Sequence, residues 1–399
     1  MDERKKNYAE KMDIVIVGAG AAGLFYGADR SCKKGMILDR SPVPGRKLLM
    51  SGSGSCNLTH EGPIKDFVDK YGQNGRKIRK ALHAFNNSDT MKFFENLGIE
   101  LMTREDGKVF PASMKAGDVR DALIKKCAGN GFDLKTGYEV RDIDRLDNAY
   151  LINGEILTDT LVLAHGGLSY PGTGSDGSMW KLLEKLGVEI VPPRPALVPF
   201  TVEKYPFKEA EGIALKNVRI EIFDGSKVAD KTGDMLFTDK YLSGPVALDI
   251  SREAIKGRKI RIRFSEVARE ALITKGISKS LGNFLTEAAG LPKALTEILI
   301  RTAGLDKDIK ASAYAAKSLR LFYEGFEFVI GDNQGYGKAM VTAGGVSLDE
   351  VNNKTFEHKR SKGLYIIGEA LDIDGATGGY NLQFAFSSAH GAASSHYSE

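Results

Sequence analysis

Residues 12–23 read M-D-I-V-I-V-G-A-G-A-A-G, and they indicate how the first part of the chain folds. The unbroken β-branched run at 14–17 predicts a strand that is buried on both faces of a parallel sheet. Gly18, Gly20 and Gly23 follow in the G-x-G-x-x-G pattern, at the point where a helix should begin. These glycines permit a tight turn, a close approach of the backbone to a pyrophosphate, and close packing of helix on strand. The helix N-terminus would then face the phosphates.

A second short strand strengthens this prediction. Residues 36–38 are hydrophobic and end in Asp39, followed by Arg40. An acidic residue at about this spacing binds a ribose hydroxyl in dinucleotide-binding folds. The plainer interpretation of the glycines is an ordinary turn between strand and helix, but strand, glycines and acid in register favour a dinucleotide site.

Composition and charge are those of an ordinary globular protein of 399 residues with a formal net charge of +4. Its length suggests two or three domains. Lysines and arginines are interleaved with acids, so we do not expect a nucleic-acid stripe. The charged start, 1–11, lacks the apolar region of a signal peptide, and no apolar run is long enough to span a bilayer. Cys32, Cys56 and Cys127 are odd in number and form no C-x-x-C pair, which favours a reducing, cytoplasmic setting without a disulfide or zinc framework, and we expect no metal site.

Residues 45–59, G-R-K-L-L-M-S-G-S-G-S-C-N-L-T, form the next unusual stretch. They are too rich in glycine and serine for a regular element, and too apolar at 48–50 for a disordered linker. Arg46 and Lys47 supply cationic donors just after the acidic strand end. We interpret the stretch as a loop that wraps a phosphorylated cofactor; a plain surface loop is the alternative.

Several further elements are expected before residue 190. Helical periodicity covers 77–97, 117–130 and 179–186, a hairpin is expected at 100–110, and strands are expected at 133–143, 150–156 and 160–164. The last of these strands runs into Gly166 and Gly167, where a backbone can lie against a flat ligand. A second G-x-G-x-x-G at 172–177 does not follow a strand, so we expect an ordinary turn into a helix there.

The texture changes beyond Pro192, Pro193 and Pro195, which indicate a domain boundary. Short strand candidates typical of an antiparallel sheet or barrel follow at 198–202, 218–223, 235–238, 247–250 and 259–264. Residues 266–321 then show helical patterns, and 326–330 return to strand. The sequence predicts a β-rich insert with a small helical domain nested inside it.

The end of the chain resembles its beginning. A buried strand at 364–367 ends in Gly368 and Glu369, and a helix is expected at 383–393. A strand end followed by a helix N-terminus is a second ligand-facing edge of the same sheet. We therefore predict a discontinuous cofactor domain. The expected segments are 1–193 and 340–399 for the cofactor domain, 194–264 and 323–339 for the β insert, and 265–322 for the helical domain.

The motifs at 15–23, 45–59, 166–177, 341–346 and 368–388 together resemble the bacterial aminoacetone-oxidase-type FAD-binding family of NAD(P)/FAD-dependent oxidoreductases. Some members of that family are reductases of dehydro-bile acids. The resemblance covers nearly the whole chain. It implies a Rossmann-like α/β FAD domain in two segments, an inserted β-barrel-like domain and a small nested helical domain.

The resemblance also implies a set of cofactor contacts. The glycine turn and the helix start would hold the FAD pyrophosphate, Asp39 the adenosine ribose and Val140 the adenine, while the other residues would lie along the ribityl chain and the flavin. The expected cofactor-binding residues are Gly18, Gly20, Ala21, Ala22, Gly23, Asp39, Arg40, Arg46, Lys47, Gly52, Asn57, Val140, Gly166, Gly167, Gly368, Glu369, Asp374, Gly379, Asn381 and Leu382.

The chain departs from the family pattern at four places. Asp39 stands where glutamate is usual, Ser55 where arginine is usual and His165 where threonine is usual, and 234–243 lacks a histidine that often follows F-T. Asp39 is one methylene shorter than glutamate, so its hydrogen bonds to ribose would need a shifted backbone. Ser55 removes a cation that would face the flavin or the substrate; we still expect FAD binding, but the substrate cannot be carried over from other members.

These observations predict an FAD-dependent oxidoreductase. Hydride would pass between a small organic substrate and flavin N5, with NAD(P)H or dioxygen as the second substrate, in a cleft between the FAD domain and the insert. The sequence leaves reductase and oxidase open. It also leaves open a flavin-dependent RNA-modifying or RNA-binding protein, for which the basic strand at 256–263 is the candidate surface, and a protein in which FAD is only structural.

No catalytic residue is assigned from the sequence, and three side chains remain open. Cys56 is either a redox thiol or a packing residue. His165 is either a proton donor near the flavin or a structural histidine. Tyr380 is either a donor to a substrate carbonyl or part of the core. Asp372 and Asp374 are expected to bind backbone or cofactor hydroxyls.

Overall fold

The structure is a computed structural model that describes residues 10–274 and 277–395. The charged residues 1–9, on which the expectation of no signal peptide mainly rests, lie outside this part. The chain forms two compact units, the first made of Met1–Pro195 and Met340–Glu399, the second of Ala196–Ala339. The finer division predicted from the sequence stays a prediction.

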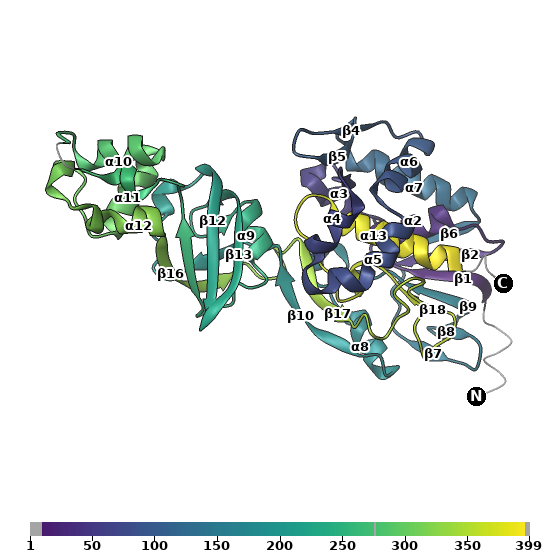
Figure 1. The fold of residues 1–399 in the computed structure, drawn as a ribbon. Helices are drawn as coiled ribbons and strands as arrows, with labels where there is room; N and C mark the ends of the chain where they lie inside the picture. Colours follow the sequence, from purple (N-terminus) through teal and green to yellow (C-terminus); the bar gives the residue numbers. More distant parts are fainter. Residues whose placement is uncertain (1–9, 275–276, 396–399) are drawn as a thin grey trace. The chain divides into compact units, whose positions relative to one another are not determined.

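A mixed sheet lies at the centre of the first unit, parallel except for β7 (Ile143–Arg145) and β8 (Tyr150–Ile152), which pair antiparallel at one edge (Figure 1). β1 (Glu10–Val17) lies between β2 (Gly35–Asp39) and β9 (Ile156–Leu163) and runs parallel to both. Val15 and Ile16 are fully buried, as a strand covered on both faces requires. The remaining strands of this sheet are β6 (Phe132–Thr136) and β18 (Leu364–Ile366). The strands predicted at 133–143 and 150–156 are therefore too long, because Gly137 (φ +68°) and Gly154 (φ +70°) turn the chain.

Helices from both ends of the chain cover this sheet. α13 (Tyr380–Ser394) packs beside α2 (Ala21–Asp29), so the last helix lies against the helix that follows the glycine turn (Figure 1). Phe25 of α2 contacts Phe386 of α13, with ring centroids 4.9 Å apart. The other helices of the unit are α3 (Arg46–Met50), α4 (Ile64–Phe67), α5 (Gly75–Ala84), α6 (Asn87–Asn96), α7 (Ala116–Gly129) and α8 (Ser178–Lys185).

Two small sheets complete the first unit. β3 (Thr59–His60), β4 (Leu101–Thr103) and β5 (Lys108–Pro111) form one, in which β4 and β5 are the predicted hairpin. β10 (Ile190–Ala196) pairs with β17 (Val341–Val346) in the other. The prolines at 192, 193 and 195 thus lie inside a strand, in a two-stranded sheet where a missing N–H is tolerated.

The second unit is built on a closed antiparallel barrel. Ile220 and Ile222 of β12 and Ile260 and Ile262 of β15 are fully buried inside it. Its strands are β11 (Phe200–Val202), β12 (Ala214–Asp224), β13 (Ser226–Phe237), β14 (Leu242–Ser243), β15 (Lys259–Arg263) and β16 (Phe326–Asn333). The barrel and the sheet of the first unit confirm the predicted α/β fold class with its inserted barrel.

One predicted strand is a helix. Residues 247–250 belong to α9 (Pro245–Ile250), which begins with a proline in its first turn after Gly244 (φ +82°). A proline at the first helical position costs no hydrogen bond and presets φ, so the Gly-Pro pair starts a helix where the apolar run alone suggests a strand.

The helices predicted between the barrel strands are present. α10 (Leu281–Ala289), α11 (Lys293–Thr302) and α12 (Arg320–Glu324) share one hydrophobic core with the barrel, through Leu295 and Phe322 among others. No helix in the described part of the chain is both long and apolar enough to cross a membrane.

Candidate functional site

The glycine turn after β1 has the form that the sequence predicts. A Cβ atom on Gly18, whose φ is +105°, would lie 2.4 Å from the carbonyl oxygen of Ala164, and one on Gly23 would lie 1.9 Å from the Gly18 oxygen. Both positions therefore need glycine for packing. Gly20 differs, because a Cβ there would meet nothing within 4 Å. The space in front of Gly20 is open, as the approach of a ligand to the backbone requires.

The N-terminus of α2 can accept an anion. Gly20 is its N-cap and supplies no side-chain hydrogen bond, and the first turn, which includes Ala21 and Ala22, holds no acidic residue. The first N–H groups of a helix have no partner within the helix, and the dipole adds positive potential there. This end of the helix thus presents donors without a competing carboxylate.

Asp39 ties the end of β2 to the glycine turn. Its two carboxylate oxygens accept hydrogen bonds from the backbone N–H groups of Ala19 and Ser41, each 2.7 Å long. Burial raises the pKa of this carboxyl, and the hydrogen bonds from Ser41 and Ala19 oppose that shift. Each oxygen keeps a further lone pair that can accept a ribose hydroxyl. The shorter side chain is accommodated here by direct contact with the turn.

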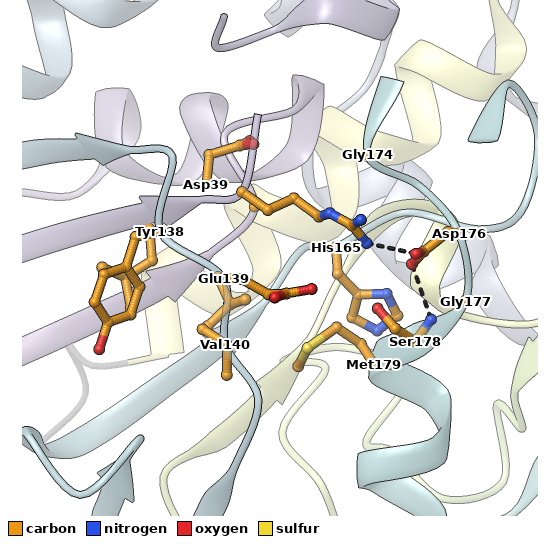
Figure 2. Close-up of a pocket in the computed structure, with 14 residues that line it drawn as sticks. Asp39, Tyr138, Glu139, Val140, His165, Gly174, Asp176, Gly177, Ser178 and Met179 are labelled. Atoms are coloured by element: carbon orange, nitrogen blue, oxygen red, sulfur yellow. Dashed lines mark hydrogen bonds and ion pairs between the residues drawn. The ribbon is translucent and has the colours of Figure 1, made fainter. Parts of the chain in front are cut away.

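A pocket opens beside Asp39 (Figure 2). Val140 lines it, as the adenine contact predicted for its backbone requires. Its far wall comes from the second glycine motif, through Gly174 and Gly177, which the sequence suggests is only a turn. It is a turn that leads into α8, with both glycines at positive φ, but it also forms part of the pocket.

Arg40 holds this wall in place. Its guanidinium lies 2.5 Å from the carboxylate of Asp176, which also accepts the backbone N–H of Ser178 at 3.1 Å. Hydrogen bonds from Ser178 and Arg40 lower the pKa of Asp176 despite its partial burial. Arg40 therefore acts here as a clamp between β2 and the start of α8, with its charge already paired.

His165 lies in the same pocket (Figure 2). Burial lowers the pKa of its imidazole to about 4, so the ring is neutral at pH 7. Its Nε2 is buried and has no hydrogen-bond partner among the described residues. The structure places His165 with Asp39 and Val140, so its surroundings favour a structural or adenosine-facing role over that of a proton donor at the flavin.

The 45–59 stretch is not an irregular loop throughout, as its composition suggests. Residues Arg46–Met50 form α3, which starts after Gly45 at φ +66°, and Ser51–Gly54 form a 3₁₀ turn in which Gly52 has φ +55°. Arg46 is exposed at the start of α3. Leu48 is buried against the core, so this short helix is held by an apolar contact that the glycine-rich composition does not indicate.

Lys47 connects three of the predicted segments. Its ammonium lies 2.6 Å from Oε2 of Glu369 and also donates to the hydroxyl of Ser169. The Ser169 hydroxyl donates to Oε1 of Glu369 at 2.8 Å, and the same oxygen accepts the backbone N–H of Thr342 at 3.0 Å. Gly167 fits between, since a Cβ there would lie 2.5 Å from Oγ1 of Thr342. This polar cluster is partly buried, with side-chain exposures of 25% for Lys47 and 21% for Glu369.

The C-terminal loop closes against the 45–59 stretch. The side-chain amide of Asn57, oriented to satisfy both of its ends, accepts the Gly379 N–H at 3.0 Å and donates to the Thr59 oxygen at 2.9 Å. Asn381 accepts the Gly375 N–H at 2.8 Å and donates to the Gly375 oxygen at 2.9 Å. Asn57 and Gly379 are therefore joined directly, whereas Asn381 orders the loop at Gly375; Leu382 is half-buried.

The remaining predicted positions lie next to the Lys47–Glu369 cluster and the loop that contains Asn381. Gly166 has φ +76° at the end of β9, and Gly368 has φ +64° at the end of β18, where its N–H donates to Ser388 at 3.0 Å. Asp374 is 7% exposed. Asp372 accepts the Gly344 N–H at 2.9 Å, which agrees with the expected backbone-binding role.

The surroundings of Tyr380 and Cys56 bear on whether each side chain reacts or packs. Tyr380 is 5% exposed, and His60 stacks on its ring at 5.3 Å. Cys56 is fully buried, and burial raises the pKa of its thiol to about 12. Cys32, Cys56 and Cys127 all lie in the described part of the chain, and none of them forms a disulfide there. These surroundings favour packing roles for both side chains.

Comparison with known proteins gives matches along nearly the whole chain. The Rossmann domain of HI0933-like proteins matches residues 12–395. The ribosomal RNA dihydrouridine synthase of Haemophilus influenzae is 33% identical, over 95% of this chain and 97% of its own length. That of Escherichia coli is 31% identical, over 95% and 96%. The 3-dehydro-bile acid delta(4,6)-reductase of Clostridium scindens is 29% identical, over 94% and 97%.

The cofactor of this Rossmann domain is FAD, and the residues present fit it. The open space at Gly20, the uncapped start of α2 and the free lone pairs of Asp39 suit a pyrophosphate and a ribose. The pocket beside Val140 suits an adenine. Which atoms each residue contacts stays a prediction.

Proposed function

The chain belongs to the HI0933-like Rossmann family, and from that premise we propose that it is an FAD-dependent reductase of a carbon–carbon double bond conjugated with a carbonyl group. The observation that carries this proposal is the chemistry shared by two differently named kinds of full-length relative. Dihydrouridine is uridine with its C5–C6 double bond, next to the C4 carbonyl, reduced. A delta(4,6)-reductase of a 3-dehydro bile acid reduces double bonds conjugated with a ketone. The chain itself is a flavoprotein of an oxidoreductase family.

Two substrate classes follow, in order of support. A uridine in RNA is supported by the relatives at 33% and 31% identity. A small cyclic enone is supported by the relative at 29% identity. Both present a planar ring with a polarised double bond, so one binding surface over a flat cofactor suits either.

The chain's own residues would bind and orient the cofactor. When bound, FAD supplies hydride transfer at its isoalloxazine ring. The turn at Gly18 and Gly20 would hold the pyrophosphate and Asp39 the ribose. Lys47, paired with Glu369, would fix the segments on either side of the flavin end, and the Asn57–Gly379 contact would close the loop over it. Cys56, protonated and buried, would pack rather than react.

The test is a two-step anaerobic reaction of the purified holoprotein. NADH or NADPH is mixed with it while flavin absorbance is followed, and the bleached protein is then mixed with a uridine-containing ribosomal RNA transcript or with a conjugated dienone steroid. A reductase reoxidises its flavin with one of these acceptors and yields a product two mass units heavier. Reoxidation by dioxygen alone, with peroxide formed and neither acceptor reduced, would establish an oxidase instead. A flavin that no donor bleaches would leave FAD as a structural ligand.

A further inference from the structure

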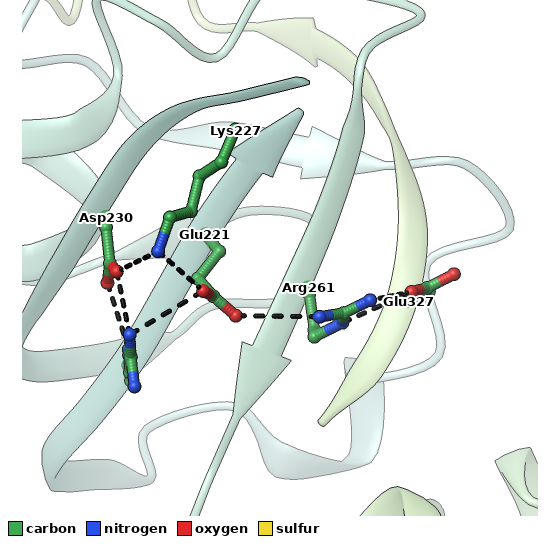
Figure 3. Close-up of polar contacts among 6 residues, drawn as sticks. Glu221, Lys227, Asp230, Arg261 and Glu327 are labelled. Atoms are coloured by element: carbon green, nitrogen blue, oxygen red, sulfur yellow. Dashed lines mark hydrogen bonds and ion pairs between the residues drawn. The ribbon is translucent and has the colours of Figure 1, made fainter. Parts of the chain in front are cut away.

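The basic stretch 256–263, whose last five residues form β15, has most of its charge paired with acidic residues. Arg261 lies 2.6 Å from the carboxylate of Glu327 (Figure 3). Arg258 lies 2.7 Å from Asp224, and Lys256 lies 2.8 Å from Asp332. These acids neutralise the stripe that the sequence offers as an RNA surface, so the stripe as a whole is a solvated, ion-paired face.

Two cations of this strand, Lys259 and Arg263, have no ion pair among the described residues; Lys259 is exposed, whereas Arg263 is half-buried. In the sheet register Arg263 lies directly opposite Arg219 of β12, so two cations face each other across neighbouring strands. Arg219 is compensated, because its guanidinium donates to both oxygens of Asp230 at 3.0 and 2.7 Å. Within the described residues Arg263 forms no ion pair, and its buried Nε has no hydrogen-bond partner. Like charges opposite each other and a buried donor without a partner both destabilise a fold.

A hollow of about 410 Å³ lies at this point. Besides the two arginines and Asp230, its lining includes the neutral donors Asn217, Thr232 and Tyr323. Asn217 has φ +57° at a register shift of β12, a strained position of the kind that recurs next to binding sites. Asp230 is committed to Arg219 and Lys227, whose hydrogen bonds hold its pKa well below the usual range. The hollow therefore combines one unpaired guanidinium with several neutral donors.

We propose that this hollow binds a singly charged phosphate linkage, with Arg263 as the cationic anchor. A guanidinium fork matches two phosphate oxygens, and the neutral donors can satisfy the others. Glu266 also lines the hollow and is exposed, so the site offers little excess positive charge. A singly charged phosphate linkage suits that balance better than a dianion. A singly charged phosphate of this kind comes either from the phosphodiester of an RNA strand or from the pyrophosphate of a nicotinamide dinucleotide; its assignment to RNA rests on the proposed function.

The test measures binding of a fluorescein-labelled twelve-residue oligouridylate to the holoprotein by fluorescence anisotropy. We expect Arg263→Gln to weaken binding roughly tenfold, the size of one charge-assisted bidentate contact. Arg261→Gln is the matched control, because it removes an equal charge from the same face of the same strand but from a side chain that is already ion-paired. It should change the dissociation constant less than about twofold.

A second arm uses NADPH, with half-saturation of flavin bleaching as the readout, and a third follows thermal unfolding. If Arg263→Gln shifts only the NADPH arm, the bound phosphate is that of the dinucleotide pyrophosphate. Arg263→Gln should unfold at no lower temperature than the wild type, since it removes an uncompensated cation. The proposal would be overturned if the wild type and Arg263→Gln bind oligouridylate with the same dissociation constant and also show the same half-saturation by NADPH. Oligouridylate binding that depends on Arg263, without reduction of any uridine, would keep this site and refute the RNA substrate alone.

Discussion

Gly20 offers a substitution that separates cofactor binding from folding. Its φ of −84° is ordinary for any residue, and a Cβ atom there meets nothing within 4 Å. Gly20→Leu should therefore fold. Because a side chain restricts the unfolded backbone, the apoprotein should gain up to about 1 kcal/mol in free energy of unfolding, or about 2–4 °C in Tm for a domain of this size.

The same side chain would fill the space that a pyrophosphate needs. A hydrogen bond from a backbone N–H to a charged phosphate contributes about 1.5–3 kcal/mol, so the loss of two costs at least about 3 kcal/mol. That corresponds to a Kd for FAD raised about 100-fold or more. The assay is the ratio of flavin to protein after denaturation, together with a titration of apoprotein with FAD.

Two controls frame the result. Gly129 on α7 is exposed and equally open, so Gly129→Leu should keep full flavin content. Gly23→Ala would place a Cβ 1.9 Å from a backbone oxygen and should destabilise the fold itself. A Gly20→Leu protein that retains FAD at the wild-type ratio would refute the assignment of this turn to the pyrophosphate.

Three further outcomes are expected. The pKa of His165 falls from 6.5 to about 4 on folding, so the neutral imidazole contributes stability above pH 6.5 that is lost as the pH falls toward 4. At about 1.4 kcal/mol per pKa unit, the free energy of unfolding of the wild type should fall by about 2–3 kcal/mol more than that of His165→Asn between pH 7 and 4.5. Denaturant titrations in which the two proteins lose the same free energy of unfolding would disprove this. Lys47→Met leaves Glu369 unpaired and should lower the free energy of unfolding by about 1–3 kcal/mol and weaken FAD binding, whereas an unchanged Kd would place Lys47 outside the flavin site. Cys56→Ala should keep the rate of flavin bleaching by NAD(P)H, and a loss of that rate with flavin content intact would show a redox thiol.

The sequence predicts best where a single physical requirement fixes a position. Gly18 and Gly23 are required because a side chain at either position would collide with backbone atoms. Asp39 ends β2, and the burial of that strand places it inside the sheet. These requirements are local, so the first unit could be outlined from them. The prediction of a strand at 247–250 was wrong, because strands and short buried helices have similar apolar composition. Only the Gly-Pro pair at 244–245 indicates that a helix begins here.

The candidate site could be predicted only in part, because its contacts join residues that are far apart in the sequence. Asn57 and Gly379 were both named, but their contact joins segments more than 300 residues apart. The wall formed by Gly174 and Gly177 was not expected, since a glycine motif without a preceding strand carries no sign of what faces it. Arg263 was named only as part of a basic strand; its lack of a partner depends on which residues other strands bring beside it.

The pairing of β18 with β9 has a consequence for how the protein is made. Leu364 lies beside Leu161, so the sheet that carries the glycine turn gains this strand only from the final part of the chain. During synthesis the whole barrel unit, Ala196–Ala339, leaves the ribosome before Glu369 can meet Lys47. Until then Lys47 and Ser169 lack their shared carboxylate, so a nascent chain has the predicted adenosine end of the site before it has the other end. Truncation near the C-terminus should therefore remove cofactor retention before it removes the barrel.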